Sequence, residues 1–184
     1  MQALNIQWFQ WLHAGSQPGA GWLAFALLCA QSLVQIVGGL ALLLSLAGPA
    51  PLRRRLLQAL LAVAIGALLA GLVHRFWPQP RPFMLDLGPL WLDHAARAGL
   101  PSSHATGMFS LGFALWLQGG RRLGGVLLLL GALVGWSRVY LGVHFPLDIL
   151  AALPVGWLAA WLARAFVTGL GRAARPGPQA ASAG

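Results

Sequence analysis

Long apolar stretches dominate this chain and leave few folds open to it. Crossing the hydrocarbon core of a bilayer takes about 17–25 helical residues, and five apolar runs approach or exceed that length: 20–47, 56–73, 102–118, 123–143 and 146–168. Apolar residues make up 58% of the 184 residues and charged residues only 8%, against about one quarter in ordinary soluble domains. The sequence therefore predicts an all-α fold, an integral membrane helical bundle of about five transmembrane helices.

A further short helix is expected before the first run. The segment LNIQWFQWLHA carries apolar side chains at Leu4, Trp8, Trp11 and Leu12, a spacing typical of one helix face, and it predicts a short N-terminal helix lying against the membrane surface. The first twenty residues have no basic region followed by a long apolar core. We therefore expect no cleavable signal peptide.

The chain shows no internal repeat that would divide it into several domains. We expect one membrane-embedded domain over residues 1–170, followed at 171–184 by a disordered cytoplasmic tail rich in Gly, Pro and Ala. The single cysteine, Cys29, lies in an apolar stretch and is interpreted as a small buried hydrophobic residue.

The arginines predict the orientation of the helices. Arginines cluster at 53–55, at 121–122 and after residue 171, and these three segments would alternate onto one side of the membrane. The positive-inside rule makes that side the cytoplasm. The connection 74–101 and the turn near residue 144 are therefore expected to face outward.

Four arginines are exceptions to this rule, because they fall on the outward side: Arg75, Arg81, Arg97 and Arg138. An anionic ligand at that surface would explain them. The net charge of +9 comes from arginine alone. Because the arginines lie between apolar runs, we interpret the charge as setting the orientation of the chain in the bilayer and as binding anionic lipid. No nucleic-acid partner is expected.

The first candidate site segment is HRFWPQPRPFM at 74–84. Its prolines stiffen the backbone, so Arg81 is presented from a rigid segment, and a rigid guanidinium suits phosphate, which it grips through two parallel hydrogen bonds. The alternative is a proline-rich turn whose arginines merely contact lipid headgroups.

The second segment is GLPSSHATGMF at 99–109, where the third run begins. Ser102 or Ser103 is placed to cap a helix, and His104 lies in its first turn. The free N–H groups and positive dipole of such a helix N-terminus favour an anion. The alternative is an ordinary capped helix with an interfacial histidine.

The third segment, SRVYLGVHFPLD at 137–148, lies on the same predicted side. Pro146 is suited to a first helical turn, and Asp148, four residues after His144, is placed to reach one ring nitrogen of that histidine. Such a carboxylate fixes the tautomer and raises the basicity of the other nitrogen. His144 is therefore a candidate nucleophile. The simpler alternative is a structural His–Asp pair at a helix end, whose two side chains only hydrogen-bond to each other.

Together, HRFWPQPRP, PSSH and SRVYLGVHFPLD resemble the three signatures of the type 2 phosphatidic acid phosphatase superfamily, KxxxxxxRP, PSxH and SRxxxxxHxxxD. The resemblance extends from about residue 56 to residue 161, and the segment beginning LNIQWF is similar to bacterial undecaprenyl pyrophosphate phosphatases of the bacitracin-resistance type. It implies a phosphatase without metal or cofactor that works through a phosphohistidine intermediate on a membrane lipid, at the extracytoplasmic face of a bacterial plasma membrane.

The resemblance also implies roles for individual residues. His144 would attack phosphorus, Asp148 would orient it, and His104 would protonate the leaving oxygen and later activate water. The phosphoryl oxygens would be held by Arg81, Arg138, Ser102 and the backbone amides near Ser103 and His104. The superfamily's lysine falls at His74 here, with Arg75 adjacent, so either residue is a candidate for that phosphate contact.

Undecaprenyl diphosphate is the substrate that this resemblance favours, with phosphatidylglycerophosphate, phosphatidic acid and lipid A phosphates as alternatives. A vanadate haloperoxidase shares the pocket, but those proteins are soluble, whereas this chain is strongly apolar. A third alternative is a non-enzymatic lipid-binding or metal-binding protein; two histidines and an aspartate could ligate zinc, but surrounding arginines would repel a cation. The sequence does not determine an oligomeric state.

Overall fold

The computed structural model describes residues 2–173, with side chains described through residue 170. The elements in chain order are α1 (Gln2–Leu12), α2 (Ala20–Leu27), the π-helical turn η1 (Leu28–Ser32), α3 (Leu33–Ala47), α4 (Ala50–Phe76), the 3-10 turn η2 (Pro82–Leu85), α5 (Ser103–Leu117), α6 (Arg121–Tyr140) and α7 (Pro146–Ala173). No strand occurs in this part of the chain, and the predicted all-α fold is confirmed. Helix α7 includes residues 171–173, and the rest of the predicted tail lies outside the described residues.

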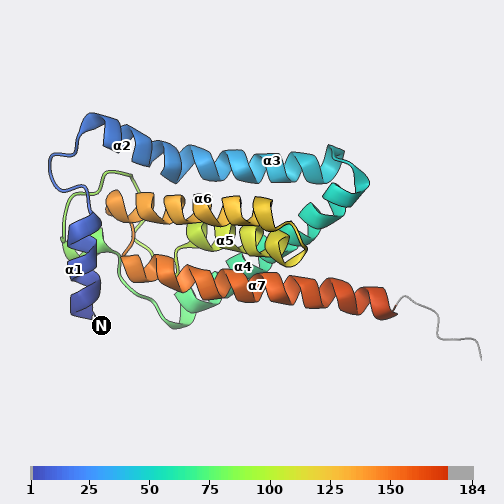
Figure 1. Cartoon of the computed structure of the whole chain (residues 1–184). Helices are drawn as coiled ribbons and strands as arrows, with labels where there is room; N and C mark the ends of the chain where they lie inside the picture. The colour runs from blue at the N-terminus through green and yellow to red at the C-terminus, as the bar shows by residue number, and fades with distance from the viewer. Residues whose placement is uncertain (1, 174–184) are drawn as a thin grey trace, which may run out of the picture.

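Four helical stretches are long and apolar enough to cross a membrane: Ala20–Ala47, Ala50–Phe76, Arg121–Tyr140 and Pro146–Leu170. The first consists of α2, η1 and α3 in one continuous rod, which lies along the edge of the bundle in Figure 1. Four of the predicted spans are therefore confirmed as helices of sufficient length, and the protein is a multi-pass membrane protein.

Helix α5, expected as the remaining span, differs from the others. It has 15 residues, which at 1.5 Å per residue gives about 22 Å, less than the roughly 30 Å of a hydrocarbon core. It packs against α4, α6 and α7, and nine of its residues are buried. Helix α5 nevertheless runs from the end that holds the connection 77–102 to the end that holds the α5–α6 connection (Figure 1). The predicted bundle of about five crossing helices is therefore retained, with α5 as a short interior helix and the other four long and apolar enough to cross a membrane on their own.

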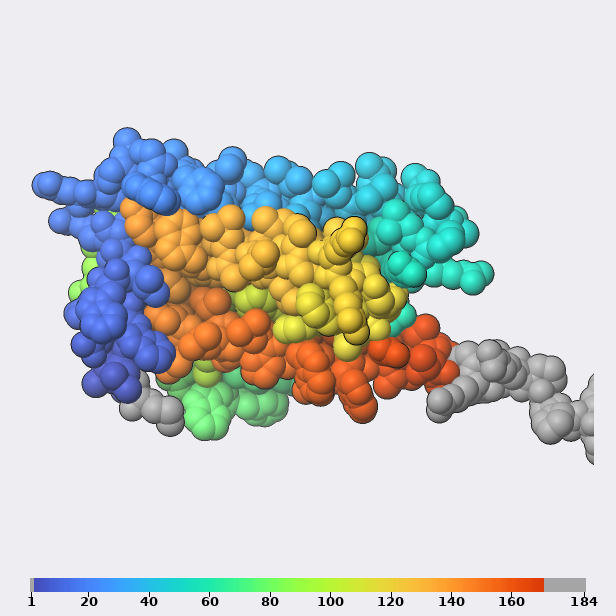
Figure 2. All heavy atoms as spheres, viewed as in Figure 1, coloured from blue at the N-terminus to red at the C-terminus, as the bar shows by residue number. Residues whose placement is uncertain are grey.

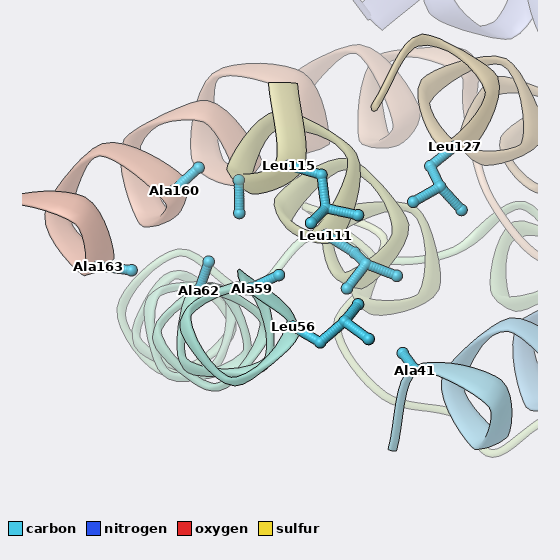
Figure 3. Packing of buried hydrophobic residues seen from close by; sticks show 10 residues of the cluster. Ala41, Leu56, Ala59, Ala62, Leu111, Leu115, Leu127, Ala160 and Ala163 are labelled. Atoms are coloured by element: carbon cyan, nitrogen blue, oxygen red, sulfur yellow. The ribbon is translucent and has the colours of Figure 1, made fainter. Parts of the chain in front are cut away.

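Small residues let the helices approach closely around α5. Ala59 and Ala62 of α4 face Ala160 and Ala163 of α7, and the leucines of α5 fill the space beside them (Figure 3). Between α5 and α7, a Cβ added to Gly156 would lie 2.9 Å from the backbone nitrogen of Ser110. Since apolar side chains gain little by leaving lipid, close packing of this kind is what stabilises helix pairs in membranes.

The connections between helices gather at two opposite ends of the bundle (Figure 1). The α3–α4 and α5–α6 connections lie at one end, together with the arginine-rich N-termini of α4 and α6. The long connection 77–102 and the turn 141–145 lie at the other end. The three candidate site segments therefore meet at a single end of the molecule, as the run lengths predict.

Helix α1 lies across this second end, roughly perpendicular to the long helices (Figures 1 and 2). It is anchored by Phe9, which is fully buried against Val139 and Phe145. The four apolar residues expected on one face are exposed: Leu4, Trp8, Trp11 and Leu12. An exposed apolar stripe beside the helix ends fits the predicted contact with the membrane surface, which stays a prediction.

Candidate active site

The turn between α6 and α7 holds the centre of the site. Gly142 has a φ of +82°, and an added Cβ would lie 2.7 Å from the carbonyl oxygen of Pro89, so both the left-handed backbone and the close approach require glycine. After it, the amides of Val143 and His144 donate to the carbonyl of Arg138 at 2.9 and 3.2 Å. These bonds close the end of α6 and direct His144 back into the bundle.

His144 is held from both sides of its ring. Its Nδ1 lies 3.0 Å from Oδ2 of Asp148, and its Nε2 lies 3.1 Å from Nη1 of Arg81. A guanidinium can only donate and a carboxylate oxygen accepts, so Nδ1 carries the proton and Nε2 presents a lone pair. Burial lowers the pKa of His144 well below 6.5, with further contributions from Arg81 and Arg138. The imidazole is therefore neutral, the form that a nucleophile requires.

Asp148 connects three parts of the site. Its Oδ2 also accepts the amide of Phe145 at 2.9 Å, and its backbone carbonyl accepts the amide of Ser102 at 3.1 Å. Pro146 begins α7, which places Asp148 in the first turn, where the positive end of the helix dipole stabilises a carboxylate. One residue thus orients His144 and fixes the start of α7 against the start of α5.

Arg81 reaches this centre from the loop that follows α4. Its guanidinium donates to the carbonyls of Arg97 at 2.8 Å and Ala98 at 3.2 Å. Gly99 packs against it, since an added Cβ would lie 3.1 Å from Cγ of Arg81 and 3.0 Å from Oδ2 of Asp148. The loop therefore holds the arginine rigidly, as its prolines predict.

The N-terminus of α5 supplies unused hydrogen-bond donors. Ser102 is the N-cap residue, but its side chain makes no cap bond, and its fully buried hydroxyl has no partner within the described residues. Ser103 is exposed and His104 half-buried in the following turn. A buried hydroxyl without a partner costs about 1–3 kcal/mol, so its presence beside free helix amides indicates a site for an anionic ligand.

Arg138 lies close to this helix start. It is buried at 3% exposure, and its Nε has no hydrogen-bond partner among the described residues. Together with His104 it lines a pocket of about 470 Å³. Arg138 and Arg81 are two buried cations, whereas Asp148 is the buried carboxylate of the site and Asp93 is an exposed carboxylate on the pocket lining. An incoming phosphate would neutralise the buried positive charge.

The two candidates for the superfamily's lysine differ in position. Nε2 of His74 lies 2.9 Å from the carbonyl oxygen of Pro101. Because a carbonyl only accepts, this nitrogen donates, and Nδ1 can donate to a phosphate only when the ring carries both protons. Arg75 is exposed on α4, and it makes no side-chain hydrogen bond within the described residues. The structure thus brings His74, rather than Arg75, to the loop that precedes α5.

Sequence reasoning did not single out several residues that line the pocket. His94, from the long connection, has its ring centroid 6.5 Å from that of His144, and burial together with Arg81, Arg138 and Arg97 lowers its pKa to about 4. Gln31, Ser32 and Gln35 reach the pocket from η1 and α3. Polar residues four apart in an apolar run were the signal available in the sequence. Among the described residues, no group of three or more His, Cys, Asp or Glu side chains is placed to hold a metal ion.

Comparison with known proteins identifies the family. Residues 55–172 match the model of the PAP2 superfamily. YbjG of Escherichia coli (strain K12) is 33% identical over 162 residues, which cover 86% of this chain and 80% of YbjG. Undecaprenyl-diphosphatase BcrC of Bacillus subtilis is 32% identical over 110 residues, which cover 60% of this chain and 56% of BcrC. The fold is shared with the crystal structure of Aquifex aeolicus LpxE, with a TM-score of 0.68, 23% identity and coverage of 88% of this chain and 95% of LpxE. The chain belongs to the PAP2 superfamily, as its three motifs predict.

Proposed function

We propose that this protein removes the terminal phosphate of undecaprenyl diphosphate through a phosphohistidine at His144. The observation that carries the proposal is the state of this side chain: a buried, neutral imidazole whose Nδ1 is held by Asp148 and whose Nε2 faces the guanidinium of Arg81. A phosphoryl group bound by Arg81 would take the place of the guanidinium in front of Nε2 and so bring its phosphorus to the lone pair that now accepts from Arg81.

The reaction would proceed in two displacements at phosphorus. In the first, Nε2 of His144 forms a bond to the terminal phosphorus as the bridging P–O bond breaks, and the imidazolium form of His104 gives its proton to the departing lipid monophosphate. Burial and Arg138 lower the pKa of His104 to about 3, so this form requires the bound anionic substrate, whose charge raises the pKa. In the second, His104 takes a proton from water, the water oxygen attacks phosphorus and the P–N bond breaks. Inorganic phosphate leaves, and His144 recovers its lone pair.

Charge on the equatorial oxygens is what such a reaction must stabilise. Arg81, Arg138, the Ser102 hydroxyl and the first amides of α5 provide fixed donors around one position, without reorganisation at the moment of reaction. Three observations support this assignment: Arg138 lines a cavity together with His104, Arg81 contacts His144, and Ser102 is the N-cap residue of α5. These residue roles are our assignment from the motifs and the geometry.

The choice of substrate rests on relatives and on the membrane location. BcrC, at 32% identity, is an undecaprenyl-diphosphatase by name, and a protein built almost entirely of membrane helices suits a lipid whose tail remains in the bilayer. The connections that carry the site lie at one end of these helices (Figure 1), where the headgroup of a membrane lipid is found.

The purified protein in detergent is expected to release phosphate from undecaprenyl diphosphate at an unchanged rate in excess EDTA, because every donor in the proposed site comes from the chain. Phosphate release measured against phosphatidylglycerophosphate and phosphatidic acid would rank the alternative lipids. An Arg122→Ala variant, altered at the opposite end of the bundle, serves as the control and should release phosphate at the same rate as the unaltered protein, with and without EDTA. Loss of activity in EDTA with recovery on added divalent metal would contradict the mechanism.

We also propose that the site faces the extracytoplasmic side, because the arginine-rich N-termini of α4 and α6 lie at the opposite end. In a Cys29→Ala background, a cysteine replacing exposed Asp86 is expected to react with an impermeant thiol reagent in whole cells. A cysteine replacing exposed Arg121 should react only after lysis. The reverse pattern would invert the topology.

A further inference from the structure

One membrane-spanning helix carries a polar patch that the proposed mechanism does not use. Gln31, Ser32 and Gln35 interrupt the apolar rod Ala20–Ala47, whose outer surface is otherwise made of residues such as Leu40, Leu42 and Leu43. Polar groups at membrane depth are disfavoured unless they face a polar cavity or bind a ligand. Their position therefore requires a partner.

The patch faces the candidate active site. All three residues line the pocket of about 470 Å³ that also contains His94, His104, Arg138 and the exposed carboxylate of Asp93. The amide-bearing residues Gln31 and Gln35 are exposed to this cavity and are not buried between helices. The amide groups are therefore available to whatever occupies the space next to His104.

A π-helical turn positions the patch. Residues Leu28–Ser32 form this turn within the otherwise α-helical rod, and Gln31 lies inside it while Gln35 follows one turn later. A π turn inserts one extra residue and rotates the following helix face, and such turns occur frequently at functional sites. Gln31 and Gln35 are four residues apart and so share one helix face, and the extra residue of the π turn changes the direction in which this face points, here toward the cavity.

The direction of the reaction identifies which part of a substrate lies there. His144 is only 1% exposed, behind Arg81, whereas His104, which protonates the leaving oxygen, lines the cavity with the glutamines. A diphosphate with its terminal phosphorus at His144 must therefore extend past His104 toward Gln31 and Gln35. The group that reaches them is the second phosphate, which stays on the lipid.

We propose that Gln31 and Gln35 bind the lipid-attached phosphate of the substrate and so select diphosphates over monophosphates; this rests on the proposed function. Amide N–H groups donate hydrogen bonds to phosphate oxygens, and a neutral amide is less unfavourable on a lipid-facing helix than a third arginine. A monophosphate substrate would present an alkyl chain at the same place, with no acceptor for either amide.

The test compares farnesyl diphosphate with farnesyl monophosphate, which differ only in the second phosphate. Gln31→Met and Gln35→Met remove the amide while keeping a side chain of similar length and flexibility. Because a hydrogen bond to a charged group contributes enough for a change of about tenfold or more, we expect the ratio of kcat/KM for the diphosphate to kcat/KM for the monophosphate to fall about tenfold in each variant. In the double variant this ratio should be lower than in either single variant.

Gln58→Met is the matched control, because Gln58 lies on α4 beside Arg55 and Gln118, at the opposite end of the bundle; its ratio should equal that of the unaltered protein. Equal losses on both substrates, or an unchanged ratio in the double variant, would overturn the assignment while leaving the proposed function intact. If the unaltered protein hydrolyses neither farnesyl nor undecaprenyl diphosphate, the proposed function is wrong, and so is the role of Gln31 and Gln35 that rests on it.

Discussion

Replacing His144 with alanine is expected to lower kcat by about 10⁴-fold or more and to abolish the covalent phosphoenzyme, because no other lone pair occupies the position in front of Arg81. The imidazole Nε2 is 3.1 Å from Nη1 of Arg81, and alanine leaves that space empty. The measurement is twofold: phosphate release at steady state, and radiolabel retained on the protein after an alkaline detergent quench, in which a phosphohistidine survives.

His104→Ala provides the contrast. A general acid contributes about 10²–10⁴-fold when the leaving group is poor, so turnover of the lipid diphosphate should fall within that range. With p-nitrophenyl phosphate, whose leaving group needs little protonation, this variant should still form the phosphoenzyme and then hydrolyse it slowly. Labelled protein should therefore accumulate. Equal loss of label in His104→Ala and His144→Ala would show that the two roles are misassigned.

The fold could be predicted where a single physical constraint acts along the chain. Apolar runs of bilayer length gave four of the helices, and the arginines placed the two ends of the bundle, because burial in lipid and the cost of unpaired charge act on each segment separately. The same reasoning located α5 but did not predict that the other helices enclose it. Its run at 102–118 is apolar because its neighbours enclose it, and composition alone does not distinguish a residue that faces lipid from one that faces another helix.

The motif residues of the site could be predicted from the sequence, whereas the rest of its lining could not. His144 and Asp148 are four residues apart, so the first turn of α7 brings them together by local geometry, and the Arg81, Ser102 and His104 segments share an end because of helix alternation. The polar lining from Gln31, Gln35 and His94 was not predicted. The spacing of Gln31 and Gln35 is visible in the sequence, but the direction of their helix face depends on the rotation at η1, and the place of His94 depends on the path of a long loop. Neither the rotation nor the loop path has a periodic signal in the sequence.

The choice between His74 and Arg75 also depended on packing between distant segments. Adjacent residues on a helix point about 100° apart, so only one of them can face the loop before α5. The structure turns His74 toward Pro101 and leaves Arg75 exposed. The sequence contains both residues but not the rotation of α4 about its axis.

Asp148 offers a test that separates charge from geometry. Its Oδ2 alone accepts from both Nδ1 of His144 and the amide of Phe145, so the carbonyl oxygen of an asparagine can occupy the same place and keep both bonds. Asp148→Asn should therefore fold normally and preserve the tautomer, while removing the negative charge that stabilises the cationic phosphohistidine. A unit charge about 4 Å away contributes on the order of 4 kcal/mol at an effective dielectric constant of about 20, which corresponds to about 10³-fold in the rate of phosphorylation.

Asp148→Ala removes the acceptor as well as the charge. The buried amide of Phe145 then lacks a partner, which costs about 1–3 kcal/mol of stability, and His144 is free to place its proton on either nitrogen. We expect this variant to melt at a lower temperature and to lose at least about tenfold more phosphorylation rate than Asp148→Asn. The matched control is Asp86→Asn, at an exposed position with a φ of +53° that asparagine tolerates. If Asp148→Asn retained the full phosphorylation rate, the carboxylate would serve only to hold the turn, and the charge that stabilises the intermediate would have to come from elsewhere.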